Sequence, residues 1–324
     1  MMGIVSRNAW TISLGAFLAL LLIATKLIQP DFGVSGLDSV SRAALPFALA
    51  TLGMSIVVIS GGIDLSIASV MAVASVTGAV LMQGRSDVVS VLVVAFVLLV
   101  GLVIGAANGA LIVLTRVPDI VVTLAALFVW EGVAILILES PGGAIAHWLQ
   151  ALIVGGMTIP GLPDHVTAWI PKSLVVLLCC VAIIWVPIVR SKLGLMLYAV
   201  GSDQLAAFRS GVPVARTRIL AYALAGLFAA LGGLATTMST GIGEPIPGPY
   251  LLAAVAAAVL GGVPLTGGKG GLLGPLLAVF ILRLMRLDLT LLSVDPNATS
   301  IIEGTVMVVV VMFGGLIAVR STKS

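Results

Sequence analysis

Long, almost uncharged hydrophobic runs follow one another along the chain, separated by short polar or glycine-rich stretches. A helix of about 20 such residues is long enough to cross the hydrocarbon core of a bilayer. The pattern predicts an all-α integral membrane protein with about ten transmembrane helices, some of them broken or re-entrant. The eighth run is short for a full crossing, so a partial helix is expected there. The runs lie near residues 10–28, 43–60, 67–83, 88–115, 119–138, 173–189, 217–239, 250–262, 271–287 and 300–319.

Composition supports a membrane protein and excludes a soluble one. Hydrophobic residues make up 60% of the 324 residues and charged residues only 9%, whereas soluble domains carry about 25% charged residues. The net charge of +3 is small and forms no basic stripe, so nucleic acid is not an expected partner. We expect one transmembrane domain spanning residues 1–324.

The positive charges predict the orientation, because Lys and Arg concentrate in cytoplasmic loops. With ten spans and a cytoplasmic N-terminus, ten Lys and Arg residues fall inside and six fall outside or near the outer helix ends. Both termini are therefore expected in the cytoplasm. The inner residues are Arg7, Arg116, Arg190, Lys192, Arg209, Arg216, Arg218, Lys269, Arg320 and Lys323, and the outer ones are Lys26, Arg42, Arg85, Lys172, Arg283 and Arg286.

A carboxylate interrupts the apolar pattern between the second and third spans, in the sequence Gly61-Gly62-Ile63-Asp64-Leu65-Ser66. Intramembrane charges are costly and mark functional sites by default, and paired glycines allow a helix to break. Asp64 would therefore either line a transport path or cap the following helix by accepting from the amides after Ser66. Its position directly before a helical run favours the cap. Asn108 is expected to make an interhelical hydrogen bond.

The most basic inner segment, residues 190–218, has the sequence grammar of a short helix between two spans. Ser202 or Asp203 can cap this helix, Gly211 can end it, and Pro213 cannot continue it. Two interpretations are open, namely an amphipathic connector on the membrane surface and a docking site for a partner. The candidate coupling residues are Gly201, Ser202, Asp203, Gln204, Ala206, Ala207, Arg209 and Gly211.

A glycine-rich stretch before the ninth span invites comparison with a phosphate-binding loop. The comparison fails, because a Walker A sequence needs glycine where Val263 stands and Ser or Thr where Gly270 stands. We expect a tight inner turn, no ATPase site of the chain's own, and no metal site, because metal-ligand spacing is absent. The turn residues are Gly261, Gly262, Gly267, Gly268, Lys269 and Gly270.

The 201–212 segment resembles the Gly-x-x-x-x-Ala-Ala-x-x-x-Gly cytoplasmic loop by which permeases of ABC importers dock on their ATPase. Other stretches, in the same order along the chain, resemble ribose-type sugar permeases. Three departures are that Gln204 stands where the loop usually has glutamate, Ala68 where the family usually has glycine, and Glu131 where a basic residue is common. The stretches are Gly61–Ser66, Gly105–Gly109 followed by Leu111 and Ile112, Pro118–Leu124, and Pro249–Leu252 leading into Val259–Gly270.

The resemblance implies a multi-pass permease of the bacterial cytoplasmic membrane that imports a monosaccharide. Its implied partners are a cytoplasmic ATPase that holds ATP and magnesium, an extracytoplasmic binding protein, and a second permease chain, identical or similar. Cargo alternatives are nucleosides, branched-chain amino acids or a sugar-derived signal. An alternative of another class is an ion-coupled secondary transporter with Asp64, Glu131 and Glu303 as ion sites. No catalytic motif supports a membrane-embedded enzyme.

Overall fold

The computed structural model describes residues 9–246 and 248–321, and it is helical throughout apart from turns and two isolated bridges. Helices occupy all ten predicted ranges. The charged residues Arg7 and Lys323, which entered the orientation argument, lie outside the described residues. The elements are α2 (Ala9–Ile28), α3 (Val34–Ile59), α4 (Ile67–Met82), α5 (Asp87–Thr115), α6 (Asp119–Ile137), α7 (His147–Ala151), α8 (Asp164–Thr167), α9 (Lys172–Cys180), the π-helical turn η1 (Val181–Trp185), α10 (Val186–Val189), α11 (Lys192–Ser202), α12 (Gln204–Arg209), α13 (Val214–Thr240), α14 (Tyr250–Leu260), α15 (Leu273–Leu291) and α16 (Pro296–Ser321).

Six helical segments in the described part of the chain are both long enough and apolar enough to cross a membrane. The fragments α9, η1 and α10 form one of these. The helices α4 and α14 are apolar but shorter, and the 11 residues of α14 extend only about 16 Å at 1.5 Å per residue. This length agrees with the partial helix expected near residues 250–262. The six are Ala9–Ile28, Val34–Ile59, Asp87–Thr115, Asp119–Ile137, Lys172–Val189 and Val214–Thr240.

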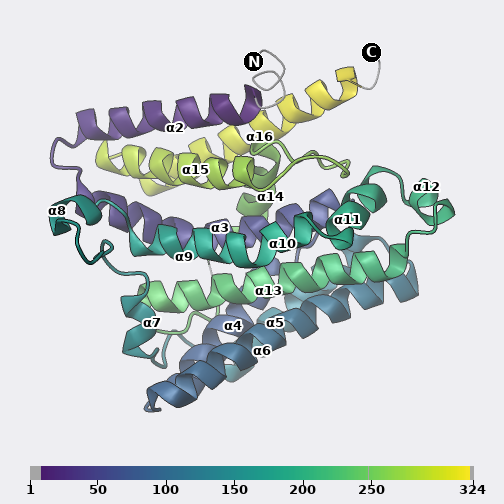
Figure 1. Ribbon diagram of the computed structural model, residues 1–324, viewed down its shortest axis with the longest axis horizontal. Coiled ribbons are helices and arrows are strands. Elements are labelled where there is room, and N and C mark those ends of the chain that lie inside the picture. Colours follow the sequence, from purple (N-terminus) through teal and green to yellow (C-terminus); the bar gives the residue numbers. More distant parts are fainter. Residues whose placement is uncertain (1–8, 247, 322–324) are drawn as a thin grey trace.

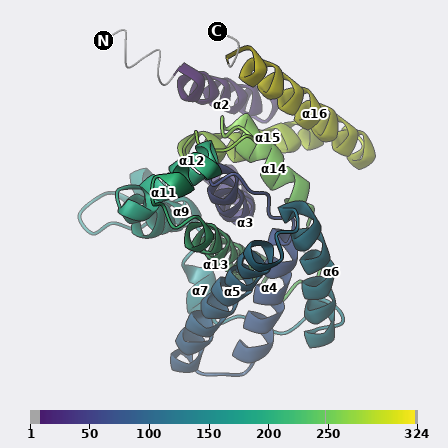
Figure 2. The same cartoon turned by 90° about the vertical axis from the view of Figure 1, so that its right-hand side faces the viewer.

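Two of these helices form the centre of the bundle. In the apolar part of α3, 89% of the residues are buried, and in that of α13, 72% are buried. In α2 the share is only 11%. The helices α4, α5 and α6 pack on one side of this centre, and α2, α15 and α16 lie on the other (Figures 1 and 2). A surface of exposed apolar side chains is what a bilayer requires of the peripheral helices.

Glycine allows α5 and α13 to approach closely. A Cβ on Gly105 would overlap the carbonyl oxygen of Tyr222, and a Cβ on Gly101 would meet Gly226 in the same way. Small residues at such contacts let helix backbones pack tightly where lipid removes the hydrophobic driving force. The N-terminal half of α13 therefore packs tightly against α5, which matters for the site below.

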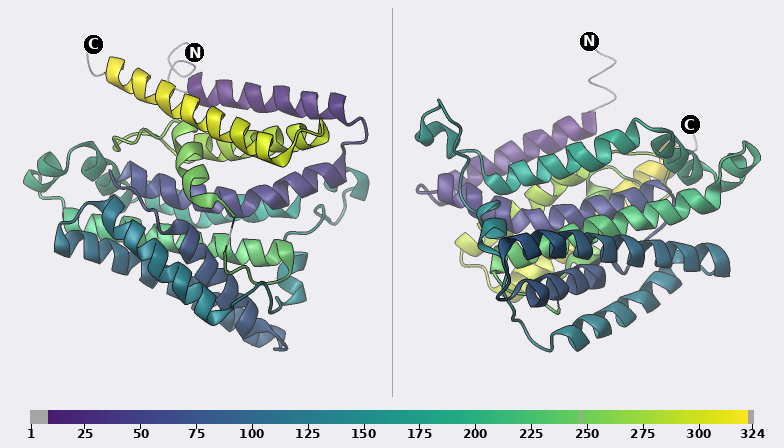
Figure 3. Two further views of the ribbon diagram at one scale, coloured as in Figure 1. Left: turned by 180° about the vertical axis from the view of Figure 1, so that it is seen from behind. Right: turned by 60° about the horizontal axis from the view of Figure 1, so that its bottom comes forward.

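The long helices lie roughly along the longest axis of the molecule, and the connections between them gather at the two ends of the bundle (Figures 1 and 3). The short helices α7 and α8 lie at one end and α12 protrudes at the other. We call the second the α12 end, and its connections are residues 60–66, 116–118, 203–213 and 261–272.

Candidate functional site

The protruding helix α12 has the limits that its sequence predicts. The carboxylate of Asp203 accepts from the backbone amides of Leu205 and Ala206, both at 2.9 Å, so Asp203 rather than Ser202 is the cap. At the other end Gly211 adopts a left-handed φ of 82°. The amide of Val212 then donates to the carbonyl of Ala207 at 3.0 Å, which is the closing bond of a glycine-terminated helix.

The exposed surface of α12 is more apolar than a connector in water requires. Leu205 is 58% exposed and Phe208 is 69% exposed. Of the alanine pair, Ala206 is exposed whereas Ala207 is buried against the rest of the protein. Ala206 is therefore the alanine that a partner can approach, and Arg209 and Gln204 lie exposed on the same short helix.

The connection between α3 and α4 is a buried turn held by side chains. Asp64 Oδ1 accepts from the amide of Ser66 at 2.9 Å and from its hydroxyl at 2.6 Å. The amide of Asn108 on α5 donates to the same hydroxyl at 2.8 Å, so Asn108 bonds the residue that precedes α4 rather than a residue within a second helix. As a helix cap, Asp64 would accept from the backbone amides that follow Ser66. It accepts from Ser66 itself instead, and so shapes the turn that leads into α4.

A second network meets the same turn from α6 and α13. One guanidinium nitrogen of Arg218 donates to both carboxylate oxygens of Asp119, at 2.5 and 2.6 Å. The hydroxyl of Tyr222 donates to Asp119 at 2.7 Å and lies 3.3 Å from the carbonyl oxygen of Ile63. A Cβ on Gly62 would lie 2.7 Å from both the Asp119 carboxylate and the Tyr222 hydroxyl. The network therefore leaves no room for a side chain at the turn.

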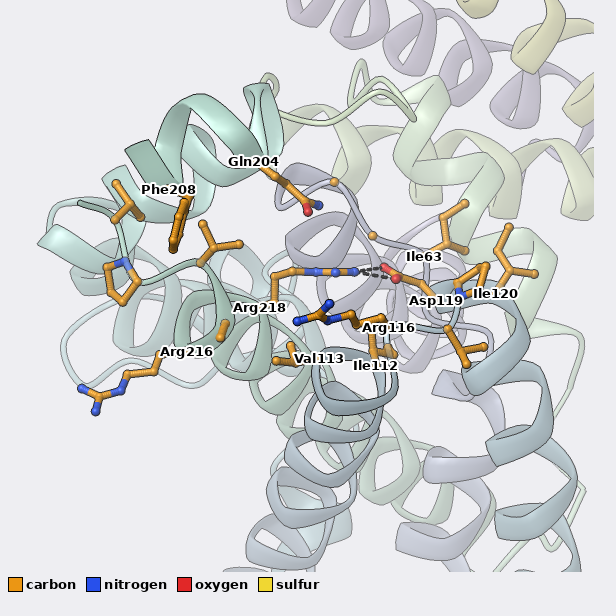
Figure 4. A pocket seen from close by; sticks show the side chains of 18 of the residues that line it. Ile63, Ile112, Val113, Arg116, Asp119, Ile120, Gln204, Phe208, Arg216 and Arg218 are labelled. Carbon is orange, nitrogen blue, oxygen red and sulfur yellow. Dashed lines mark hydrogen bonds and ion pairs between the residues drawn. The ribbon is translucent and has the colours of Figure 1, made fainter. Parts of the chain in front are cut away.

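The sequence did not single out this network. Asp119 stands in the first turn of a helix, where an acidic residue is ordinarily explained by the helix dipole, and Arg218 reads as one of several inner charges. Tyr222 reads as an apolar residue of a span. Only the fold, which brings the first turn of α6 next to the start of α13 at the α12 end, places the three together (Figure 4).

The predicted inner turn contacts both α3 and α11. Gly267 and Gly268 adopt left-handed φ values of 78° and 69°, and the amide of Gly268 donates to the last carbonyl of α3, that of Ile59, at 2.9 Å. A Cβ on Gly201, at the end of α11, would overlap the same carbonyl. The three backbones therefore approach at a distance that only glycine permits.

Tyr198 adds a side-chain bond between α11 and this turn. Its hydroxyl donates to the carbonyl of Gly270 at 2.8 Å, and burial raises the pKa of the hydroxyl. Gly261 packs against the start of α15, since a Cβ on Gly261 would overlap Pro275. Gly262 has a left-handed φ of 88°, and the side chain of Lys269 is exposed. The segment that carries α12 thus contacts the end of α3 through Gly201 before α12, and the start of α6 through the Arg218–Asp119 pair after it.

A pocket of about 1000 Å³ opens beside α12 (Figure 4). Its walls come from the α3–α4 turn, the end of α5, the start of α6 and the segment from α12 to α13. Gln204 and Phe208 of α12 form one side, and the Asp119–Arg218 pair lies in the wall opposite. Gln204 of the predicted coupling segment and Gly61 and Gly62 of the predicted helix break therefore line one concave surface.

Other charged residues from the sequence analysis lie elsewhere. Arg286 pairs with Glu303 at 3.6 Å, which is the pairing expected of an intramembrane acid. Arg283 lies over the rings of Phe47 and Tyr250, with its guanidinium carbon 5.0 Å and 5.9 Å from their centres. It is thus engaged inside the bundle rather than extended to a membrane interface.

Comparison with known proteins agrees with this architecture. The model of one family, described as branched-chain amino acid transport system / permease component, matches residues 36–311. The autoinducer 2 import system permease protein LsrD of Escherichia coli O9:H4 is 28% identical over 317 residues, which cover 94% of this chain and 92% of that protein.

A second relative comes from a different bacterium. The probable ABC transporter permease protein y4mJ of Sinorhizobium fredii is 30% identical over 317 residues, covering 96% of this chain and 90% of that protein. No solved structure matches the chain.

Proposed function

The chain belongs to the family of branched-chain amino acid transport system permease components and is a transmembrane subunit of an ABC importer, and we propose that α12 is its docking site for the ATPase. The observation that carries this proposal is that the segment around α12 is attached to helix ends on both sides, to the end of α3 through Gly201 and to the start of α6 through the Arg218–Asp119 pair. A displacement of α12 would be transmitted to the ends of α3, α6 and α13 together.

We place the α12 end in the cytoplasm. The inner Lys and Arg residues support this placement, because Arg116, Arg209 and Lys269 belong to the connections at that end and Arg216 lies in the first turn of α13. With that orientation ten helical segments cross or partly cross the bilayer as one transmembrane domain, and both termini are cytoplasmic. The bacterial cytoplasmic membrane is the expected location.

The mechanism follows from the coupling of two states. The ATPase subunit holds ATP and magnesium, closes on ATP and moves α12. The turn at Gly61–Ser66 and the ends of the helices around it then change position, so that the path opens alternately to the two sides. The chain itself supplies no residue for ATP chemistry. It works as a pair of permease chains and receives cargo from an extracytoplasmic binding protein.

The proposed cargo is a monosaccharide, which rests on the resemblance of Gly61–Ser66 to sugar permeases. Autoinducer 2 is a second candidate cargo, because relatives 28% identical to this chain are named for its import. The family description names branched-chain amino acids, so all three belong in a cargo screen.

Replacing Ala206 by Glu tests the docking role. Ala206 is exposed on α12 and no buried contact depends on it, so the variant should insert and fold like the parent. A charged, longer side chain would prevent the close approach of a partner groove. We expect association with the ATPase from a neighbouring reading frame to fall at least about tenfold, measured by interferometry on nanodisc-embedded permease. Arg190→Glu is the matched control, because Arg190 is exposed but does not lie on α12. If Ala206→Glu binds the ATPase as tightly as the parent does, α12 is not the docking site.

A further inference from the structure

Arg116 is held in a backbone conformation that its side chain disfavours. It follows the last residue of α5 with a left-handed φ of 59°, and its amide closes the helix by donating to Ile112 at 3.0 Å. Glycine or asparagine ordinarily occupies this position, because the left-handed backbone brings the Cβ of other L-residues too close to the following carbonyl oxygen. Helix termination alone would be served better by glycine, so the structure indicates a use for the guanidinium.

The guanidinium of Arg116 lies in a pocket with an excess of positive charge. Three arginines, Arg116, Arg216 and Arg218, line the pocket against a single acidic residue, Asp119. Arg116 and Arg218 reach into the pocket, whereas Arg216 extends away from it (Figure 4). Asp119 is already bonded by Arg218, and the Nε of Arg218 is buried and has no hydrogen-bond partner among the described residues. The pocket therefore offers donors and positive charge to an anionic group.

The occupant is constrained by the position of the pocket. Gln204 and Phe208 of α12 form one side of it, and Phe208 is 69% exposed. A protein docked on α12 would cover these residues and the pocket mouth together. A carboxylate from the covering protein can bond a guanidinium through two parallel hydrogen bonds.

We propose that the pocket is the second part of the ATPase docking surface and that it receives an acidic side chain of the ATPase, with Arg116 as the receptor. This inference rests on the docking role proposed for α12. It adds a contact outside the predicted 190–218 segment and joins the ATPase to the α5–α6 connection and, through Arg218, to Asp119. The partner chemistry is a carboxylate that lies next to the groove for α12.

Replacing Arg116 by Gly tests the proposal without endangering the fold, because glycine relieves the left-handed backbone. We expect the variant to unfold at the same temperature as the parent or higher, yet to bind the ATPase about tenfold more weakly. Arg116→Lys keeps the charge but not the two parallel hydrogen bonds, so it should bind more weakly than the parent and more tightly than Arg116→Gly. Arg190→Ala, which removes an exposed arginine that does not line the pocket, should bind normally.

The association constant is measured in nanodiscs of neutral lipid and in nanodiscs containing anionic phosphatidylglycerol. If Arg116→Gly weakens ATPase binding equally in both lipids, the proposal is supported. An acidic residue of the ATPase is identified as the partner if replacing it by Lys restores binding to Arg116→Glu. Unchanged ATPase binding overturns it, as does weakening confined to the anionic lipid, which would assign the pocket to a lipid headgroup. If Ala206→Glu also binds normally, the docking role itself fails, whereas loss with Ala206→Glu alone leaves docking intact and refutes only the pocket contact.

Discussion

Gly62 shows how a single residue fixes the geometry of the site. The pair Gly61-Gly62 predicts a break between two helices, and Gly61 meets that expectation with a φ of 82°. The reason for Gly62 is different, since its missing side chain makes room for the Asp119 carboxylate and the Tyr222 hydroxyl. Local sequence predicts the first role because it concerns the backbone of the turn alone. The second depends on residues 57 and 160 positions away, which no local pattern reveals.

Replacing Gly62 by Ala should therefore disrupt the network. The added Cβ would lie 2.7 Å from both oxygen atoms, so Asp119 and Tyr222 must move and weaken their bond. We expect a loss of about 1–3 kcal/mol in the free energy of unfolding, as for other overpacked sites. Thermal unfolding in detergent measures the loss.

Gly132→Ala is the matched control for Gly62→Ala. Gly132 lies inside α6, and nothing lies within 4 Å of its added Cβ. Alanine should be neutral or stabilise the helix by up to about 1 kcal/mol. Equal effects of the two substitutions would contradict the account of the turn.

At the scale of elements, α12 is the part of the site that its sequence predicts best. The cap Asp203, the terminating Gly211 and the following Pro213 are all local signals, and the structure uses them within a residue of the expected positions. The positions of α3, α6 and α13 around the α12 end are not local signals. Apolar periodicity shows that these helices exist, but in a membrane protein apolar faces contact both lipid and protein, so periodicity does not identify neighbours.

Asp203→Ala should weaken α12 without removing any docking side chain. The substitution leaves the amides of Leu205 and Ala206 without their acceptor, at a cost of about 1 kcal/mol to the helix. Because α12 has six residues and is exposed, we expect the loss to appear as faster amide hydrogen exchange in residues 204–209 and as weaker ATPase binding.

Ser191→Ala removes a comparable cap from a neighbouring helix, where the Ser191 hydroxyl accepts from Leu193 at 3.2 Å. Exchange in α12 should not change in this variant. If Asp203→Ala leaves exchange and binding as in the parent, the cap is not what orders α12.

At the scale of the whole molecule, the two ends of the bundle carry different connections. The residues that join α12 to the helices lie at one end, and the segment between α6 and α9, with α7 and α8, lies at the other (Figure 1). The order of family-like stretches along the chain predicts such a permease from the sequence. The two networks that meet at the α3–α4 turn follow only from the structure.

The central claim is that this chain imports cargo with energy from a partner ATPase. Uptake of labelled ribose and autoinducer 2 into proteoliposomes tests it, with the permease, the neighbouring ATPase and the binding protein reconstituted together. We predict uptake that needs all three proteins and internal ATP, and that Ala206→Glu abolishes. Uptake by this chain alone, driven by a proton or sodium gradient, would contradict the account.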